Sequence, residues 1–178
     1  SLSIYIPRAA KAYTKQLRTD RWRRLMIFGF EENHCTEQIC LGLKLLIHKG
    51  LEWRSQAPIF ILSADVKAAF DYLSPLVVVE AMRYWKFPSR LIAALAEESL
   101  ALHGVACLQG VETTPFSFTR SVRQGGVESS WDWNLVMRTI LDQLVDEWEA
   151  RQLGITLPEI GQVTHLLWAD NLYFLGHS

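Results

Sequence analysis

The spacing of apolar residues alternates between helical and strand-like patterns along the 178-residue chain. The first helical stretch begins at Thr36, a residue type that caps helices, and Gly50 is placed to end it. Its apolar positions recur every three or four residues and share one face: Ile39, Cys40, Leu43, Leu46 and Ile47. Pro58 then precedes the apolar run 59–62, which is typical of a buried strand. This part predicts a core-facing helix and a strand that delivers Asp65.

Two more helices and a hairpin are predicted in the middle of the chain. Ser74-Pro75 and Pro88-Ser89 each begin a helix-favouring stretch, and a proline in the first helical turn costs no hydrogen bond. Strand-like segments at 105–111 and 116–122 flank the turn residues 112–115. This arrangement indicates a β-hairpin.

A long amphipathic helix is predicted after Gly126. Its apolar stripe consists of Met137, Ile140, Leu141, Leu144 and Trp148. The opposite side is polar and carries Arg138, Asp142, Asp146 and Glu147. Strand-like runs at 163–168 and 172–175 follow, joined by Asp170 and Asn171, residue types that tolerate left-handed backbone. Helices and hairpins in this order predict an α+β fold.

Composition is ordinary for a folded globular domain, with 49% hydrophobic and 21% charged residues. No apolar run approaches the roughly 20 residues of a membrane-spanning helix, and no signal peptide is evident. We therefore expect a soluble intracellular protein, nuclear or cytoplasmic, without a membrane partner. The cysteines Cys35, Cys40 and Cys107 lack metal-ligand spacing and are expected to be buried free thiols.

The charge distribution is more informative than the net charge of −1. Residues 1–24 contain seven basic residues against Asp20 alone, so this segment carries +6 and the remainder −7. A basic arm beside an acidic body suits a nucleic-acid backbone on one side and metal-binding carboxylates on the other. The candidate backbone contacts are Lys11, Lys15, Arg18 and Arg123. The alternative is an ordinary solvated helical face.

Two acidic segments flank a glycine turn. Asp65 follows one strand, Asp170 lies in a hairpin turn 105 residues later, and Arg123-Gln124-Gly125-Gly126 stands between them. An enzyme that holds two metal ions needs carboxylates from different segments at one point. Either aspartate alone is more typical of a turn or a helix cap. The order carboxylate strand, glycine loop with helix, carboxylate hairpin indicates a polymerase palm.

Four motifs together resemble those of reverse transcriptases, specifically the enzymes of non-LTR (LINE-type) retrotransposons. Phe28-Gly29-Phe30, followed by Thr36-Glu37, is similar to the fingers motif of that family. The segment from Asp65 to Asp71 resembles the first palm motif, and the segment from Ser121 to Gly125 resembles the second. Trp168-Ala169-Asp170-Asn171 resembles the Tyr-Ala-Asp-Asp box.

The resemblance implies an architecture. Residues 58–178 would form the palm, an antiparallel sheet with helices packed on one face, truncated shortly after the second catalytic hairpin. Residues 1–57 would form partial fingers with the basic arm, and the thumb would be absent. The chain would then be part of a larger polyprotein that carries a thumb and, in some elements, an endonuclease.

The resemblance also implies a reaction. The chain would be a fragment of an RNA-directed DNA polymerase that adds dNTPs to a DNA primer 3′-hydroxyl on an RNA template by two-metal phosphoryl transfer. Asp65 and Asp170 would hold Mg²⁺, or alternatively Mn²⁺. The full implied metal set is Asp65, Val66, Asp170 and Asn171. The implied nucleotide-binding positions are Phe70, Gln124 and Gly125, where the Phe70 ring would exclude a ribose 2′-hydroxyl.

Departures from the family pattern weaken the case for catalysis. Asn171 stands where the family has a second carboxylate, and it contributes no charge against divalent cations. Glu31 and His34 replace the arginines expected in the fingers motif. Because of Asn171 and the absent thumb, we expect negligible polymerase activity from this chain alone. The alternatives are a non-catalytic remnant or nucleic-acid-binding module with a palm fold, and an RNA-dependent RNA polymerase, which Phe70 disfavours.

Overall fold

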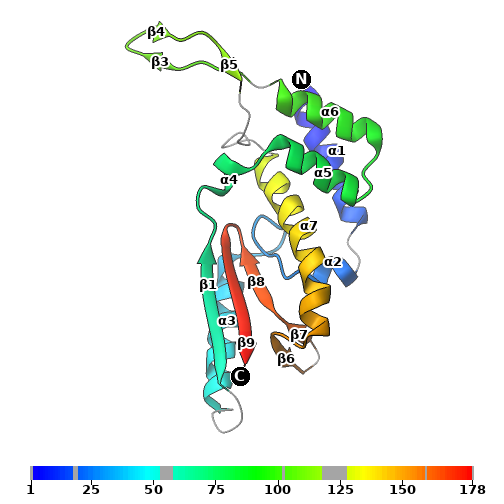
Figure 1. The fold of residues 1–178 in the computed structure, drawn as a ribbon, viewed down its shortest axis with the longest axis vertical. Helices are drawn as coiled ribbons and strands as arrows, with labels where there is room; N and C mark the ends of the chain where they lie inside the picture. The colour runs from blue at the N-terminus through cyan, green and yellow to red at the C-terminus, as the bar shows by residue number, and fades with distance from the viewer. Residues whose placement is uncertain are drawn as a thin grey trace. The chain divides into compact units, whose positions relative to one another are not determined.

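The computed structural model describes residues 2–17, 20–52, 58–101, 103–117, 128–158 and 160–177. Its contacts divide the chain into two compact units, each built from separate stretches of sequence (Figure 1). Unit 1 comprises Ser1–Leu17 and Ala68–Val136, and unit 2 comprises Arg18–Lys67 and Met137–Ser178. Helices combine with small antiparallel sheets, as the predicted α+β class requires. The boundary between fingers and palm at residues 57 and 58 stays a prediction.

A three-stranded antiparallel sheet forms the centre of unit 2. Strand β1 (Ile59–Asp65) pairs with β9 (Asn171–His177), which pairs on its other side with β8 (His165–Trp168). The predicted strand before Asp65 and the predicted hairpin around Asp170 are thus confirmed. The strand before Asp65 was expected to be buried, and this was wrong, because Phe60 and Leu62 are exposed. Strand β9 is the central one among the described strands, and β1 lies at the edge.

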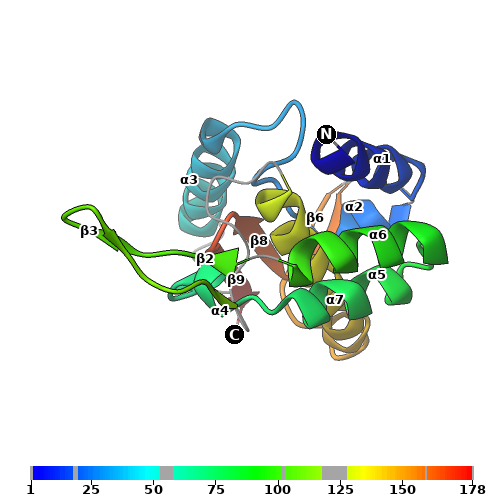
Figure 2. The ribbon, with the colours of Figure 1, turned by 90° about the horizontal axis from the view of Figure 1, so that it is seen from above.

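Helix α3 (Thr36–Glu52) covers one face of this sheet (Figures 1 and 2). Its buried side chains Ile39 and Leu46 pack with Leu166 and Leu175 from the sheet. A ribbon formed by β6 (Ile155–Leu157) and β7 (Gly161–Val163) adds Ile155 and Val163 to this core. The core of unit 2 therefore lies between α3 and the sheet.

The apolar face of α3 is narrower than predicted. Cys40 and Ile47 are exposed, because the sheet lies along only one side of the helix. Gly50 was expected to end the helix, but α3 continues for two more residues. Gly50 instead lies close to β1, where a Cβ would come within 3.1 Å of the Ile59 side chain. The expectation of buried thiols was also wrong, because all three cysteines are free and exposed.

A second helix packs on the opposite face of the sheet. Trp148 of α7 (Ser129–Ala150) contacts the rings of His165 and Phe174, with centroids 5.7 and 5.9 Å apart. Helices therefore lie on both faces, whereas the resemblance implied one. Toward the edge strand this second face stays open, because Phe60 and Leu62 of β1 are exposed.

Helix α7 is buried over much more of its surface than an amphipathic pattern predicts. Arg138 and Asp142, expected on the solvent side, are each only 3% exposed, whereas Ile140 of the apolar stripe is 45% exposed. The reason is the short helix α2 (Asp20–Arg24), whose Arg21 pairs with Asp142 and whose Trp22 ring stacks on Arg138. Among the residues that the structure describes, no helix is long and apolar enough to cross a membrane.

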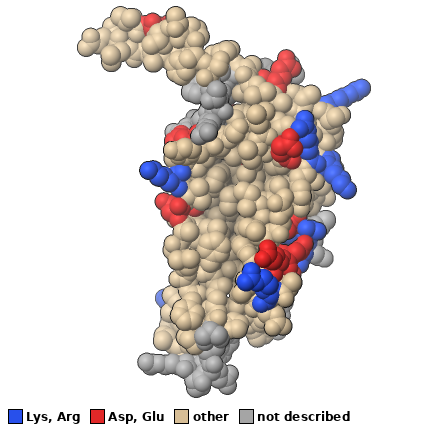
Figure 3. Space-filling model, in the orientation of Figure 1, with Lys and Arg blue, Asp and Glu red and all other residues tan. Residues whose placement is uncertain are grey.

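Two arginines of the basic arm are ion-paired to α7. Arg21 pairs with Asp142 and, at 3.2 Å, with Asp146. Arg24 pairs with Glu149 at 2.7 Å and with Asp146 at 3.5 Å. Basic and acidic side chains accordingly lie side by side along the lower part of α7 (Figure 3). Part of the predicted charge asymmetry is therefore neutralised within unit 2.

Unit 1 is mainly helical. Helices α5 (Pro75–Tyr84) and α6 (Ser89–Leu100) pack side by side, and α1 (Leu2–Gln16) packs against α6 (Figure 2). The predicted start of α5 is confirmed, because the Leu76 amide donates to the Ser74 hydroxyl over 3.3 Å. The short helix α4 (Ala69–Tyr72) precedes them.

The predicted hairpin of unit 1 exists with a different turn. Strand β2 (His103–Gly104) pairs with β5 (Phe116–Ser117), and β3 (Cys107–Leu108) pairs with β4 (Val111–Glu112). The chain reverses at Gln109-Gly110, where both residues have positive φ, instead of at residues 112–115. Two consecutive residues with positive φ form a tight turn whose twist matches that of the paired strands. Glycine adopts a positive φ without strain. The predicted strand residues 118–122 lie outside the described residues.

Candidate active site

The two acidic segments meet at one end of the sheet of unit 2. Asp65, the last residue of β1, lies directly opposite Asn171, the first residue of β9. The Val66 amide donates to the Asp170 carbonyl oxygen over 3.1 Å. The fold therefore brings all four predicted metal ligands into one cluster, although 105 residues separate the two aspartates. Their role as ligands stays a prediction.

Asp170 is carried by a two-residue turn between the paired residues Trp168 and Asn171. Ala169 adopts the left-handed backbone in this turn, with φ of 53°. Asp170 and Asn171 were expected to do so, but Asn171 instead lies in β9. Its side-chain nitrogen is 3.5 Å from the Asp170 carboxylate, at the long limit of a hydrogen bond. The amide that replaces the second carboxylate thus touches the remaining one.

The fingers motif supports this turn through the backbone. The Phe28 amide donates to the Leu167 carbonyl (2.9 Å), and the Leu167 amide donates to the Met26 carbonyl (3.0 Å). This segment therefore runs parallel to the outer edge of β8. Gly29 then passes so close that a Cβ on it would lie 2.1 Å from the Ala169 nitrogen. Only glycine fits at this position.

His165 lies deep beneath the hairpin and is fully buried. Its Nε2 lies 2.8 Å from the Leu25 carbonyl oxygen and its Nδ1 lies 2.9 Å from the Thr164 hydroxyl. Burial lowers the pKa of His165, and the hydrogen bond to Leu25 opposes this only in part. These partners assign a neutral ring that donates from Nε2 and accepts at Nδ1.

The donors at the cluster are all oxygens: the carboxylates of Asp65 and Asp170, the Val66 carbonyl and the Asn171 amide. Hard oxygen donors suit Mg²⁺ or Mn²⁺. In the parts of the chain that the structure describes, no three His, Cys, Asp or Glu side chains are grouped to hold one ion. Two carboxylates fit one divalent cation whose other ligands are water or phosphate oxygens, and they leave a second ion undercompensated.

The predicted nucleotide-binding residues are only partly described. Phe70 lies in α4 of unit 1, where it is half-buried with its ring 6.2 Å from that of Trp133. Its packing against a neighbouring ring is also compatible with an ordinary core position. Gln124 and Gly125 lie outside the described residues.

The predicted nucleic-acid contacts divide in the same way. Lys11 and Lys15 are exposed on α1 of unit 1, as phosphate contacts require. Arg18 and Arg123 lie outside the described residues.

Sequence reasoning missed a buried ion pair between Glu31 and Arg138. Their side chains are 15% and 3% exposed, and Nη2 of Arg138 lies 2.7 Å from a Glu31 oxygen. The Arg138 guanidinium also stacks over the Trp22 ring, 4.3 Å from its centroid. Two signals pointed to this pair: an acid in place of a fingers arginine, and an arginine after the apolar run Leu135-Val136-Met137. Glu31 therefore forms an ion pair with Arg138 inside unit 2, at a position where the resemblance implied an arginine.

A second buried acid lies at the start of α7 in unit 1. Asp132 is 5% exposed, and burial raises its pKa to about 8, with a further contribution from the charge of Glu128. Near neutral pH this carboxyl is therefore largely protonated.

No protein-family model matches the sequence, and no curated protein matches it either. Solved structures do. A telomerase from Candida tropicalis in complex with the TWJ fragment of telomeric RNA aligns with a TM-score of 0.69 at 12% identity, over 96% of this chain and 28% of the telomerase chain. An apo telomerase from Candida tropicalis, truncated from the C-terminal domain, aligns at 0.68 with 13% identity, over 96% and 33%.

A telomerase from Candida albicans, also with the TWJ fragment of telomeric RNA, aligns with a TM-score of 0.65 at 10% identity, over 98% of this chain and 29% of that one. The chain spans about a third of the length of these structures. At this identity the similarity concerns the fold. The chain has a reverse-transcriptase-like fold.

Proposed function

We propose that this chain is the polymerase-core part of an RNA-directed DNA polymerase, with Asp65 and Asp170 as its metal-binding carboxylates. The observation that carries the proposal is the meeting of these two residues at one end of the sheet, within a reverse-transcriptase-like fold. The substrates would be an RNA template, a DNA primer and dNTPs. RNA in two of the telomerase structures supports the template but belongs to those proteins.

Asp65 and Asp170 would hold Mg²⁺ or Mn²⁺, with the Val66 carbonyl and the Asn171 amide as neutral donors. Such an ion neutralises triphosphate charge and acidifies the primer hydroxyl. The chain itself fixes the spacing of its carboxylates: the antiparallel register sets Asp65, and the turn buttressed by Gly29 sets Asp170. Phe70 would select deoxyribose over ribose.

The finer assignment to non-LTR retrotransposons rests on the motifs. Phe28-Gly29-Phe30 and Thr36 occur in the expected order before the first acidic segment. Both motif segments lie close to the proposed site or to its sheet. Gly29 contacts the turn that carries Asp170, and Thr36 begins the helix that packs on the sheet. The telomerase similarity at low identity is equally compatible with other reverse transcriptases.

The metal site can be tested on the chain as it is, with Mn²⁺ as a paramagnetic probe in NMR. Amide signals of residues 65–66 and 170–171 should broaden first. In Asp65→Asn, the same broadening should require at least about ten times more Mn²⁺. Asp71→Asn is the matched control, because Asp71 is an exposed acid six residues further along. Broadening centred elsewhere, or equal effects of both variants, would contradict the assignment.

We propose a non-catalytic nucleic-acid-binding module as the second candidate. Two observations favour it: Asn171 lowers the charge of the metal cluster, and Lys11 and Lys15 are exposed on one helix. Such a protein would bind RNA through its surface cations without needing a divalent metal.

Asn171→Asp separates the two candidates, because it restores the second carboxylate. Primer extension on an RNA template by this variant, abolished by the additional change Asp65→Asn, supports the enzyme. Because the chain alone is expected to extend primers poorly, the module is supported only if Asn171→Asp also leaves Mn²⁺ binding at the cluster at background level while RNA binding stays intact. RNA binding is measured by fluorescence anisotropy in the same samples, so that loss of folding is not mistaken for loss of chemistry.

A further inference from the structure

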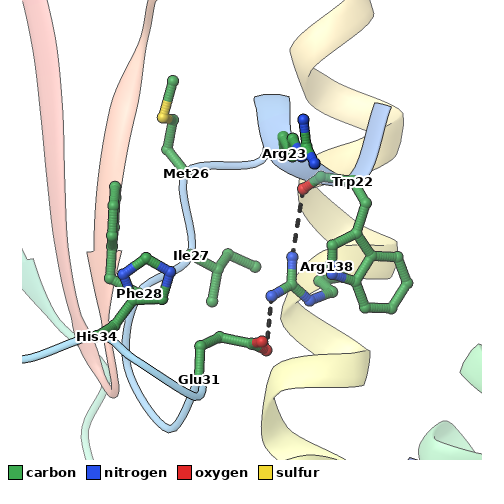
Figure 4. A pocket seen from close by; sticks show the side chains of 8 residues that line it. All are labelled: Trp22, Arg23, Met26, Ile27, Phe28, Glu31, His34 and Arg138. Carbon is green, nitrogen blue, oxygen red and sulfur yellow. Dashed lines mark hydrogen bonds and ion pairs between the residues drawn. The ribbon is translucent and has the colours of Figure 1, made fainter. Parts of the chain in front are cut away.

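Arg138 of α7 holds both ends of the segment 22–31, which contains the fingers motif. Its Nη2 donates to a Glu31 oxygen over 2.7 Å, and its Nη1 donates to the Trp22 carbonyl over a longer 3.4 Å (Figure 4). The guanidinium also stacks over the Trp22 ring. Because Arg138 is only 3% exposed, loss of the ion pair with Glu31 would leave a buried charge uncompensated. One buried side chain therefore joins the first and the last residue of this segment.

Between its two ends the segment follows the outer edge of β8. The Phe28 amide donates to the Leu167 carbonyl, and the Leu167 amide donates to the Met26 carbonyl. These hydrogen bonds fix the backbone up to Phe28. Beyond Phe28 the chain leaves the strand, and the side chain of Phe30 is 47% exposed.

The turn that follows Phe28 is strained. The Glu31 amide donates to the Phe28 carbonyl over 3.4 Å, which closes a turn with Gly29 and Phe30 at its centre. Phe30 has a φ of 58°, a left-handed value that a bulky side chain rarely adopts. Strained backbone of this kind persists only where its surroundings hold it in place. Glu31, the next residue, is the point at which Arg138 supplies that hold.

The strained turn lies against the turn that carries Asp170. Gly29 passes so close that a Cβ on it would lie 2.1 Å from the Ala169 nitrogen. Ala169 has a left-handed φ of 53° and is followed directly by Asp170. Because closely packed groups transmit displacements, a shift of the first turn is passed on to the second.

A cavity beside the segment makes the ion pair more important. Its volume is about 340 Å³, and it is lined by Arg138 and by side chains of residues 22–34 (Figure 4). Groups that border a void have fewer packing partners on that side. The contact between Glu31 and Arg138 therefore contributes more to holding the turn than it would in a filled core.

We propose that Arg138 and Glu31 are positioning residues for Asp170. Their ion pair holds the strained turn against Ala169, and this contact fixes how the Asp170 carboxylate is presented to a metal ion. The acid that replaces a fingers arginine thereby acts on the metal site without touching it. The metal role of Asp170 in this proposal rests on the proposed function.

Amide hydrogen exchange of the full 178-residue chain in EDTA tests the positioning without any metal. The Val66 amide reports on the Asp170 turn, because it donates to the Asp170 carbonyl over 3.1 Å. The Leu175 amide reports on the rest of the sheet, because it donates to the Thr164 carbonyl over 2.9 Å. Glu31→Ala should speed exchange at Val66 at least about tenfold more than at Leu175, because the turn opens locally.

Gly154→Ala is the matched control in the same unit. A Cβ at this position would lie 2.6 Å from the Val163 carbonyl oxygen, and the backbone has a φ of 98°. Alanine there should destabilise the unit next to the start of β8, at the end opposite the Asp170 turn. Exchange at Val66 should then rise no more than at Leu175. Equal acceleration of both amides in Glu31→Ala would overturn the proposal, because the ion pair would then be merely structural.

The consequence for the metal site is measured by the Mn²⁺ titration described above. In Glu31→Ala, broadening at residues 65–66 and 170–171 should require about ten times more Mn²⁺, because residues that orient a metal ligand contribute to metal affinity. Glu31→Gln, which keeps an oxygen for Arg138, and Gly154→Ala should both stay close to the parent. A looser turn with an unchanged Mn²⁺ requirement would overturn the proposal. Absence of broadening in the parent would contradict the proposed function, whereas the exchange comparison would still decide whether the ion pair positions the turn.

Discussion

Asp65, the last residue of β1, lies directly opposite Asn171, the first residue of β9, so a neutral amide is the cross-strand neighbour of a carboxylate. Without a bound cation, an aspartate at position 171 would place like charges on adjacent strands and on the same face of the sheet. Asn171 therefore avoids a repulsion that an aspartate would introduce when no cation is bound. The same residue that lowers the charge of the proposed metal site therefore favours the metal-free sheet.

Asn171→Asp is expected to make stability depend on divalent cations. In EDTA the variant should be less stable than the parent by roughly 0.2–1 kcal/mol, because like charges then face each other. Millimolar Mg²⁺ or Mn²⁺ should recover this loss and raise the melting temperature above that of the parent under the same conditions. Asn171→Ala, which adds no charge, is the control and should respond to the cation no more than the parent does.

Gly29→Ala is expected to destabilise the chain by roughly 1–3 kcal/mol, because the new methyl group would overlap the Ala169 backbone and force the segment away. Gly42→Ala is the opposite case. Gly42 lies within α3 with no other group within 4 Å of the place a methyl would take, so alanine there should stabilise by about 0.5–1 kcal/mol. Urea unfolding of both variants measures the difference. Similar effects of the two substitutions would show that Gly29 is not packed against the turn.

Elements specified by nearby residues could be predicted from the sequence. Ser74-Pro75 determines the start of α5 within its own turn, and α3 begins at Thr36 as predicted. The two aspartates of the acidic cluster could also be predicted from the sequence, because Asp65 and Asp170 each follow a recognisable strand. Only the pairing of those strands, which is a property of the fold, had to be supplied by the resemblance.

Features that depend on distant partners could not be predicted. Arg138 and Asp142 were placed on the solvent side of α7 because periodicity shows which residues share a face, not what covers that face. Their partners, Glu31 and Arg21, lie more than 100 residues away. The edge position of β1 has the same origin, because an apolar run does not reveal how many strands flank it.

His165 should make the chain less stable below about pH 6.5. Its pKa is lowered in the folded state, so the unfolded chain takes up a proton that the folded chain refuses. The stability is therefore present above the unfolded value near 6.5 and falls with decreasing pH, by at most about 1.4 kcal/mol per pH unit. His165→Gln keeps a donor for the Leu25 carbonyl and should remove this dependence. His48→Gln, at an exposed position of α3, should leave it in place.

Asp132 should act in the opposite direction. Its pKa is raised to about 8, so the folded chain keeps a proton that the unfolded chain releases near pH 4, and stability falls as pH rises between these values. Asp132→Asn should therefore stabilise the chain at pH 8 by at least about 1 kcal/mol, with little effect at pH 4.

Between about pH 5 and 6.5 the contributions of Asp132 and His165 have opposite signs. Unfolding free energies measured across this window should show a flatter profile for the parent than for either single variant.

The basic arm should divide into residues that bind nucleic acid and residues that hold the fold. Lys11→Gln with Lys15→Gln should weaken binding to single-stranded RNA and reduce the slope of log K against log salt by about 1.4, because two phosphate contacts are lost. Arg21→Gln with Arg24→Gln removes the same charge, but these arginines pair with acids of α7. That double variant should keep the slope and instead lose roughly 1–3 kcal/mol of stability, because the buried Asp142 loses its ion pair with Arg21. Equal slopes for the two double variants would mean that RNA responds to net charge alone, and the assignment of Lys11 and Lys15 as contacts would then be wrong.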